Sequence, residues 1–402
     1  MICIYIAVEY FQTARLSQMI SFQAWDGPGP MPKSRYPEPF GNHFFGDFLL
    51  QFRMAQLASP YFAEGFVPFS YFPLAAVLLG PFILFEYWLA LVLFLVTGMT
   101  TTYFICRRGL RDLTTKQRNQ IILLVFVSGP MFSAIDRGNL SLILTAICIA
   151  GVFQLREEKL FVSAILFGIA GAIKGYPCLF LLIFLRRREW KPLLAGSLAF
   201  VMSMNLPLMF YEKGYLKNLK EMISQFAGSS TTAHAIKIRA YNNSLLAFFD
   251  TCRTSVGGRF SDFFLFLENH YSICGIVLMS ILLLFAVSKY SSDLQSLLLI
   301  TVVVCVIPQT VGYYVLLLYF VPLLFLWADA ERMSLSTKLI LVALAIIMIP
   351  KGFPIWLPAN IWTPAAATYT SLLNPLCGIV IAVTCMSDVI RQRSSLISKE
   401  KL

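Results

Sequence analysis

Asp136 and Arg137 stand side by side between two apolar runs, in the stretch SAIDRGNLSLILTAI. A charge in hydrocarbon costs roughly 2.5–3.5 kcal/mol on insertion scales, so charged residues at this position indicate a functional or structural role. Arg137 can bind a phosphate through two parallel hydrogen bonds, and a helix beginning near Asn139 would direct unpaired N–H groups at the same anion. We therefore predict an anion site here, with Asp136 beside it. The alternative is an Asp136–Arg137 pair that helps to cap two helices at the lipid headgroups.

Lys174 is a second cationic position, in the stretch GIAGAIKGYPCLFLL. It lies at the expected end of one helix, and Pro177 follows at the start of the next. One helical hairpin separates Lys174 from Arg137, so both fall on the same face of the membrane. Two cations beside a helix N-terminus predict a site for a phosphate or pyrophosphate, with Tyr176 next to it. The alternative is a lysine that extends from a helix C-terminus to the headgroups.

Asp47 is an acidic candidate among aromatic residues, in HFFGDFLLQFRMA. Apolar surroundings raise the pKa of a carboxylate, which suits it to act as a general base. The alternative is an N-cap, because an aspartate before FLLQFRMAQL is a good helix start.

A polar stretch, SSTTAHAIKIRAYNNSLLAFF, precedes an expected short helix. It brings His234, Lys237 and Arg239 toward the membrane, where they could contact a bound phosphate or lipid headgroups. The residues themselves leave both interpretations open.

The composition defines the kind of protein in which these residues must work. Of 402 residues, 58% are hydrophobic and 13% are charged, whereas about 25% are charged in a typical soluble protein. Apolar stretches recur from Pro73 to Val389, which predicts an all-α polytopic integral membrane protein. The nine cysteines form no CxxC pair and the three histidines are scattered, so we expect no metal and no cofactor. The net charge of +11 indicates cytoplasmic loops rather than nucleic-acid binding.

Eleven apolar runs and their basic connections predict the topology. The runs cover 87–106, 120–135, 138–155, 160–173, 176–189, 192–211, 272–288, 294–307, 312–328, 338–350 and 373–389. If the connection 107–118, which contains five basic residues, is cytoplasmic, every second connection along the chain is basic, as the positive-inside rule requires. The opposite face then holds Asp136, Arg137 and Lys174, the loop 212–271 and the stretch 308–310. We expect this face to be the functional one.

The N-terminal segment is harder to place. Its short apolar patch cannot span a membrane and lacks the layout of a signal peptide. We interpret 72–85 as a helix in or dipping into the outer leaflet, and a first transmembrane helix as missing through a late start codon. The expected organisation is 1–86 as N-terminal segment and first external loop, 87–389 as a multi-span core and 390–402 as a basic cytoplasmic tail.

Taken together, several motifs resemble glycosyltransferase family 87, whose members resemble mannosyltransferases that use polyprenyl-phosphate-linked sugars. The motifs are FFGDFLLQFRMAQLASPYFAEG, FSYFPLAAVLLGPF, DRGNLSLILTAI, GIAGAIKGYPCLFLLIFLRRR, YNNSLLAFF and IPQTVGYYVLLLYFVPLLFL. They occur in the right order between Asp47 and Trp327. The resemblance implies a GT-C-type architecture with about 10–12 transmembrane helices.

The resemblance also implies roles for individual residues. Asp47 matches the acidic residue of the first external loop, the proposed general base. Arg137, Asn139, Lys174 and Arg239 are the expected contacts of the donor phosphate. Asp136, Tyr176, His234, Asn243, Ser244, Gln309 and Tyr313 are the expected substrate contacts. Many relatives have a histidine where this chain has Tyr313 and Tyr314, which leaves the sugar and acceptor open.

The implied reaction transfers a hexose, mannose first of all, from a polyprenyl-phosphate donor to a lipid-linked or glycan acceptor. It takes place outside the plasma membrane of a bacterium and inverts the anomeric centre. Aromatic residues such as Phe48, Tyr61 and Tyr71 could flank the sugar, but an interfacial belt is the favoured interpretation. Two rival functions are a lipid-glycan polymerase and a polytopic transporter, although the chain shows no paired repeat of the kind transporters have.

Overall fold

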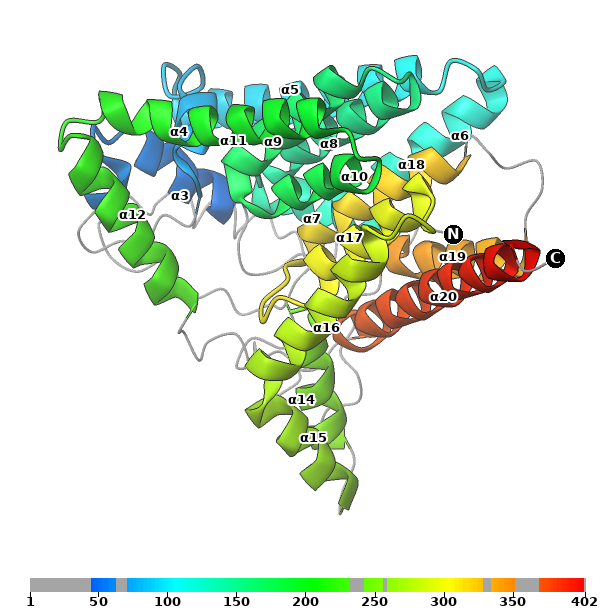
Figure 1. Ribbon diagram of the computed structural model, residues 1–402. Coiled ribbons are helices and arrows are strands. Elements are labelled where there is room, and N and C mark those ends of the chain that lie inside the picture. The colour runs from blue at the N-terminus through cyan, green and yellow to red at the C-terminus, as the bar shows by residue number, and fades with distance from the viewer. Residues whose placement is uncertain are drawn as a thin grey trace.

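The computed structural model describes residues 45–62, 71–230, 242–255, 259–327, 334–350 and 369–400. Within these ranges the protein contains 17 α-helices and no strand, so the prediction of an all-α protein is confirmed (Figure 1). Each of the eleven predicted apolar runs coincides with one helix or with two consecutive helices.

The helices fall into two halves along the chain. The first half contains α3 (Gly46–Ala55), α4 (Pro73–Leu79), α5 (Tyr87–Gly109), α6 (Thr115–Phe126), α7 (Gly129–Arg137), α8 (Ser141–Arg156), α9 (Leu160–Lys174), α10 (Leu182–Arg186), α11 (Trp190–Phe210) and α12 (Tyr215–Ser230). The second half contains α14 (Leu245–Ser255), α15 (Arg259–Asn269), α16 (Tyr271–Ala286), α17 (Asp293–Val306), α18 (Phe320–Trp327), α19 (Leu335–Met348) and α20 (Tyr369–Glu400). Short 3₁₀ segments η1 (Pro60–Phe62), η2 (Tyr176–Leu181) and η4 (Tyr313–Tyr319) complete the set.

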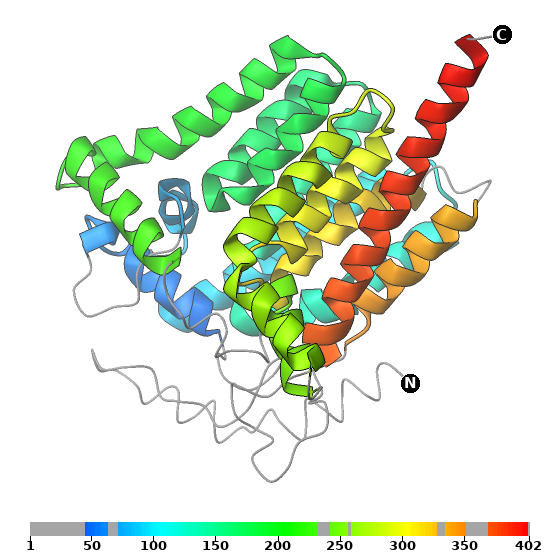
Figure 2. The ribbon, with the colours of Figure 1, turned by 60° about the horizontal axis from the view of Figure 1, so that its bottom comes forward.

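Two groups of helices form the core. In the first group α5 packs on α8, α8 on α9 and α9 on α11, and in the second α16, α17, α20 and α19 pack in succession. Contacts of α18 and η4 with α8 join the groups. Figure 2 shows these helices running side by side, while Figure 1 shows the α14–α15 hairpin projecting from the rest.

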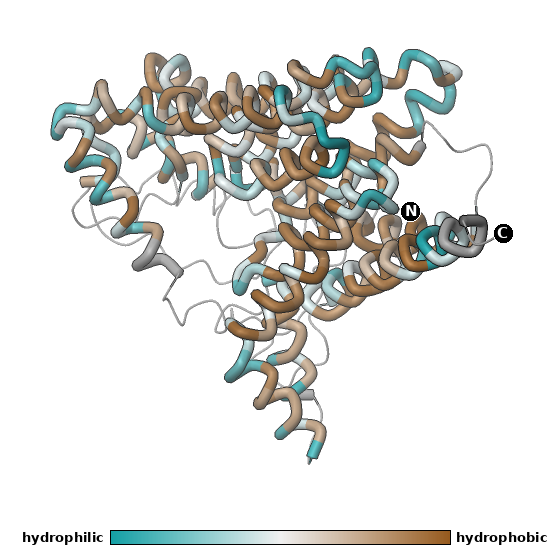
Figure 3. Tube along the Cα trace, viewed as in Figure 1, coloured by the Kyte–Doolittle hydropathy of each residue, from teal (hydrophilic) through white to brown (hydrophobic). Residues whose placement is uncertain are grey.

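The helices differ in whether they can cross a membrane alone. Helices α5, α11 and the first 27 residues of α20 are long and apolar enough, and the bent pairs α6–α7 and α15–α16 raise the number to as many as five within the described residues. Six further apolar segments have 10–17 residues. Apolar residues continue along the helices, and polar residues gather near their ends (Figure 3). The chain is therefore a polytopic membrane protein, and the predicted total of 10–12 spans stays a prediction.

Helix α4, which precedes α5, is too short to cross a membrane by itself. Helix α4 has seven residues, which extend about 10 Å, against the roughly 30 Å of a hydrocarbon core. Pro73 begins α4 at its first position, and Gly80 ends it. Together with α3, α4 packs on the core helices, and α3 reaches α5 and α7. Asp47 is thereby carried to one end of the bundle.

Basic connections meet at the other end. Arg111, which follows α5, lies 3.5 Å from Glu157, which follows α8. Arg187, which follows α10, pairs with Glu158 at 2.8 Å and with Asp293 at the start of α17. These contacts link four connections that the charge pattern assigns to one face, so their common location agrees with the predicted alternation.

Candidate active site

Six polar and aromatic side chains converge at the other end of the bundle. They come from α3, the segment before α4, the α7–α8 junction, the end of α9 and η4. We call them the Asp47 cluster: Asp47, Tyr71, Arg137, Asn139, Lys174 and Tyr314. The structure thus brings the predicted base together with three of the four predicted phosphate contacts.

Asp47 and Arg137 form a two-pronged ion pair. The Arg137 Nε donates to Asp47 Oδ2 at 2.8 Å, and Nη2 donates to Oδ1 at 3.0 Å. The side chains are only 17% and 14% exposed, so water screens the pair weakly. Arg137 pairs with Asp47 and not with its neighbour Asp136, so the suggested Asp136–Arg137 cap is wrong. The N-cap interpretation of Asp47 is also wrong, because Phe45 occupies that position and Asp47 lies in the first turn of α3.

Asn139 bonds to two other members of the Asp47 cluster. Its Nδ2 donates to Asp47 Oδ2 at 2.6 Å and to the Tyr71 hydroxyl at 3.0 Å. Its Oδ1 accepts from the backbone N–H and the hydroxyl of Ser141, at 2.9 and 2.7 Å. The buried Asn139 amide therefore holds the Asp47 carboxylate and also accepts the first backbone N–H of α8.

Gly138 allows α3 to approach the α7–α8 junction. It ends α7 in the left-handed conformation at φ 59°, which favours glycine. A Cβ at this position would lie 2.6 Å from the Cβ of Phe48, so only glycine leaves room for α3. The N–H of Phe45, itself left-handed at φ 53°, donates to the Asp136 carbonyl at 2.7 Å. The sequence Asp-Arg-Gly-Asn thus fixes α3 and supplies two partners of Asp47.

Lys174 is held by tyrosines. Its Nζ donates to the Tyr71 hydroxyl at 3.3 Å and lies 4.6 Å from the centre of the Tyr314 ring. No carboxylate of the described residues lies within ion-pair distance of this ammonium. The Tyr71–Phe72 segment rests on the end of α9, where the Phe72 N–H donates to the Ile173 carbonyl. Burial, together with nearby Tyr314 and Asp47, raises the pKa of Tyr71 well above its usual range, so the hydroxyl stays protonated.

The central Asn-Ser motif stabilises a loop next to the cluster. Ser244 Oγ donates to the Gln309 carbonyl at 2.9 Å, and Asn242 Nδ2 donates to the same oxygen at 2.7 Å. Asn243 is bonded through its N–H to the Val311 carbonyl at 2.8 Å and through Oδ1 to Asn374 at 2.9 Å. In this structure the predicted substrate contacts Asn243 and Ser244 are buried and bonded within the protein.

Tyr176 and Gln309 line an apolar cavity of about 330 Å³. The cavity lies among η2, α16 and α17. Tyr176, which lines it, is two residues after Lys174 in the sequence. Its other walls include Tyr271, Met279 and Val303, and few polar atoms face it.

The remaining predicted contacts lie elsewhere. Asp136 is buried at the end of α7, and its carbonyl holds α3. Tyr313 points away from the cluster, because its hydroxyl donates to the Ile349 carbonyl at 3.0 Å and it packs against Gly129. His234 and Arg239 lie outside the described residues.

Comparison with known families decides the class of this site. The sequence matches the model of glycosyltransferase family 87 over residues 69–311, more than half of the chain. The chain belongs to glycosyltransferase family 87. This family 87 protein is therefore a membrane glycosyltransferase that uses a sugar donor and an acceptor. The comparison with curated proteins gives no match. The family match includes Arg137, Asn139 and Lys174, whereas Asp47 precedes it and Tyr314 follows it.

Two members of the Asp47 cluster are absent from the predicted site. The sequence favours an interfacial belt for Tyr71, and it names Tyr313 rather than Tyr314 as the expected substrate contact. A tyrosine is typical both of a membrane interface and of a binding site, so residue type alone does not separate the two. In this structure both Tyr71 and Tyr314 contact Lys174.

Proposed function

We propose that this glycosyltransferase transfers a hexose, mannose first of all, from a polyprenyl-phosphate-linked donor to a hydroxyl of a lipid-linked or glycan acceptor. The reaction takes place on the extracytoplasmic face of a bacterial plasma membrane and inverts the anomeric centre. The observation that carries this proposal is the Asp47 cluster, in which one carboxylate lies beside two cations.

The carboxylate and the two cations have different roles in the reaction. The acceptor oxygen attacks the anomeric carbon opposite the phosphate, and the bond from that carbon to the phosphate oxygen breaks with its electron pair. The leaving polyprenyl phosphate thus gains one negative charge, which Lys174 and Arg137 stabilise. Asp47 takes the hydroxyl proton of the acceptor as general base. Direct displacement without a covalent intermediate gives inversion, through an oxocarbenium-like transition state.

The contacts of Asp47 connect donor binding with the base. Both oxygens of Asp47 accept hydrogen bonds from Arg137, which weakens the carboxylate as a base. A donor phosphate and Asp47 compete for the same guanidinium fork. Bound donor therefore draws Arg137 away from Asp47 and raises the basicity of the carboxylate when the acceptor is to be deprotonated.

The apolar cavity beside Tyr176 supports a lipid-linked donor. A nucleotide sugar has no apolar chain to bury, whereas a polyprenyl chain gains about 0.8 kcal/mol for each buried CH₂. The cavity adjoins the end of α9, so a chain in it would have its phosphate near Lys174.

The test uses purified full-length protein in nanodiscs, with a short-chain polyprenyl-phosphate [¹⁴C]mannose as donor and a lipid extract of host membranes as acceptor. The expected result is labelled lipid or glycan with an anomeric configuration opposite to that of the donor. GDP-mannose serves as the matched donor without the lipid. Transfer from GDP-mannose alone, or retention of configuration, contradicts the proposal.

A further inference from the structure

One aromatic ring contacts both cations of the Asp47 cluster. The Tyr314 ring centre lies 5.3 Å from the Arg137 Cζ and 4.6 Å from the Lys174 Nζ. The two cations end different helices, α7 and α9, and Tyr314 comes from η4, more than 130 residues later in the chain. A single side chain thus connects the two groups proposed to hold the donor phosphate.

Two cations that contact the same ring repel each other, so the spacing between them depends on the groups that hold them. The Asp47 carboxylate holds Arg137 through two hydrogen bonds, whereas Lys174 is held by the Tyr71 hydroxyl and the Tyr314 ring. The electron-rich face of an aromatic ring attracts cations through its quadrupole and carries no net charge. A ring therefore holds cations in place and leaves their charge available.

Tyr314 is itself firmly placed. A Cβ on Gly312 would lie 2.6 Å from Cε1 of the Tyr314 ring, so the ring packs directly on the glycine. Asn242 Oδ1 accepts from the N–H of Val311 at 2.9 Å, which stabilises the same loop. The next residue, Tyr313, is tied to α19 by its bond to the Ile349 carbonyl.

We propose that Tyr314 is a positioning residue that sets the spacing of Arg137 and Lys174 for the phosphate of the donor. This rests on the proposed function and assigns the setting of the phosphate site to the ring that contacts both cations. The buried Asn-Ser motif acts on the same site indirectly, because it stabilises the loop that carries the ring.

The experiment compares Tyr314→Leu with Tyr314→Phe, measuring KM for polyprenyl-phosphate mannose, kcat, and the Kd for polyprenyl phosphate alone. Tyr314→Leu removes the ring, so KM and Kd should rise about 10-fold, the size of a desolvated cation–π contact. The change in kcat should be smaller. Tyr314→Phe keeps the ring and should behave like the wild type. Tyr103→Leu is the matched control, because it removes a tyrosine–arginine contact at the far end of α5.

Gly312→Ala provides a second test. The added methyl group should displace the ring and raise KM, and it should add little in a Tyr314→Leu background, because the two changes act on one contact. Additive effects would contradict the proposal, as would a Tyr314→Phe variant as weak as Tyr314→Leu. Unchanged Kd and KM in a folded Tyr314→Leu protein would also overturn it. Failure of the wild type to use the donor would instead overturn the proposed function.

Discussion

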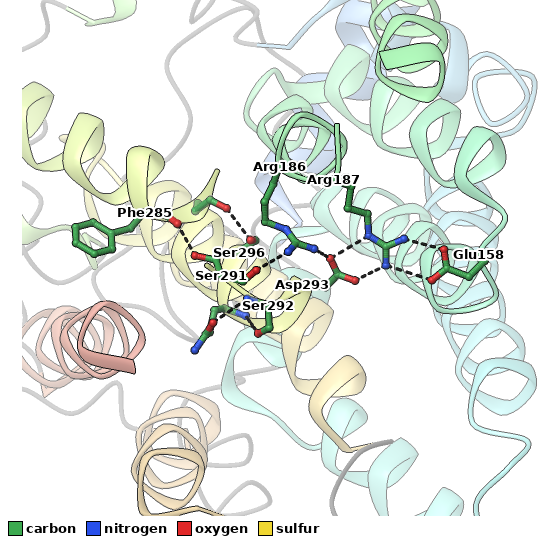
Figure 4. A network of polar contacts seen from close by, with 10 residues as sticks. Glu158, Arg186, Arg187, Phe285, Ser291, Ser292, Asp293 and Ser296 are labelled. Carbon is green, nitrogen blue, oxygen red and sulfur yellow. Dashed lines mark hydrogen bonds and ion pairs between the residues drawn. The ribbon is translucent and has the colours of Figure 1, made fainter. Parts of the chain in front are cut away.

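The bundle has a cluster of charges at each end of α8 and α9, and the two clusters treat their cations differently. At one end Arg186 and Arg187 both contact Asp293, and Arg187 also contacts Glu158 (Figure 4). At the other end Arg137 meets the single carboxylate of Asp47, while Lys174 is held by Tyr71 and Tyr314. Along α9 the two ends are about 22 Å apart.

We interpret this difference as one between a cluster that stabilises the fold and a cluster that binds the donor. A cation paired with a carboxylate is neutralised, and such a pair joins the elements that carry it, here α10 with α17. Lys174, held by a hydroxyl and an aromatic ring, keeps its charge for an anion, whereas Arg137 must first release Asp47. We therefore expect equivalent substitutions at the two ends to have opposite effects on activity and stability.

Asp-to-Asn substitutions at Asp47 and at Asp293 should give the largest contrast between the two ends of the bundle. Asp47→Asn keeps the size of the side chain and removes the proton acceptor, so turnover should fall about 10²–10⁴-fold while the lipid donor still binds. Binding and transfer are measured on the same nanodisc sample. Near-normal transfer by this variant would remove Asp47 from its proposed role.

Removing either cation of the Asp47 cluster should have the next largest effect. Arg137→Ala or Lys174→Ala should lower transfer about 10²–10³-fold, the cost of losing one preorganised stabilising group. Arg137→Lys should restore only part of the activity, because a point charge does not reproduce the two-pronged contact. The assay measures kcat/KM for the donor. Full activity in both folded alanine variants would return these residues to the role of headgroup anchors.

At the opposite end, Asp293→Asn should affect stability and spare the reaction. The variant leaves Arg186 and Arg187 without their common carboxylate, at a cost of about 2 kcal/mol for a hydrogen-bonded, partly buried charge. The melting temperature should therefore fall by several degrees, and kcat/KM at low temperature should stay at the wild-type value. A loss of activity without a loss of stability would show that the two ends are not separate in function.

Cysteine labelling tests which end faces outward, with the smallest expected effect on activity. Lys213→Cys, between α11 and α12, should react with an impermeant thiol reagent in intact cells. Asp112→Cys, in the exposed connection after α5, should react only after the membrane is opened. The reverse pattern would place the Asp47 cluster on the cytoplasmic face.

Local sequence was sufficient for the helices and for the positions of Arg137 and Lys174 at the ends of α7 and α9. Hydropathy marks each apolar segment, and Gly138 and Gly175 follow the last residues of α7 and α9 at positive φ. The charge pattern predicted that Arg137 and Lys174 share a face, which agrees with their common contact with Tyr314. It did not predict the far cluster, because nothing near Arg187 in the sequence indicates Asp293, 106 residues away.

The sequence by itself determined the membrane-protein class, the helices and the residue types that carry chemistry, because hydropathy and helix termination depend on neighbouring residues. Tertiary structure alone decided that Asp47 pairs with Arg137 across 90 residues, and that Tyr314 rather than Tyr313 faces the cations. Such pairings depend on which helices pack together and on close approaches such as that of α3 to Gly138. The physical reason is that packing brings together residues that are distant in sequence. A local pattern of polarity does not specify which of these residues will be in contact.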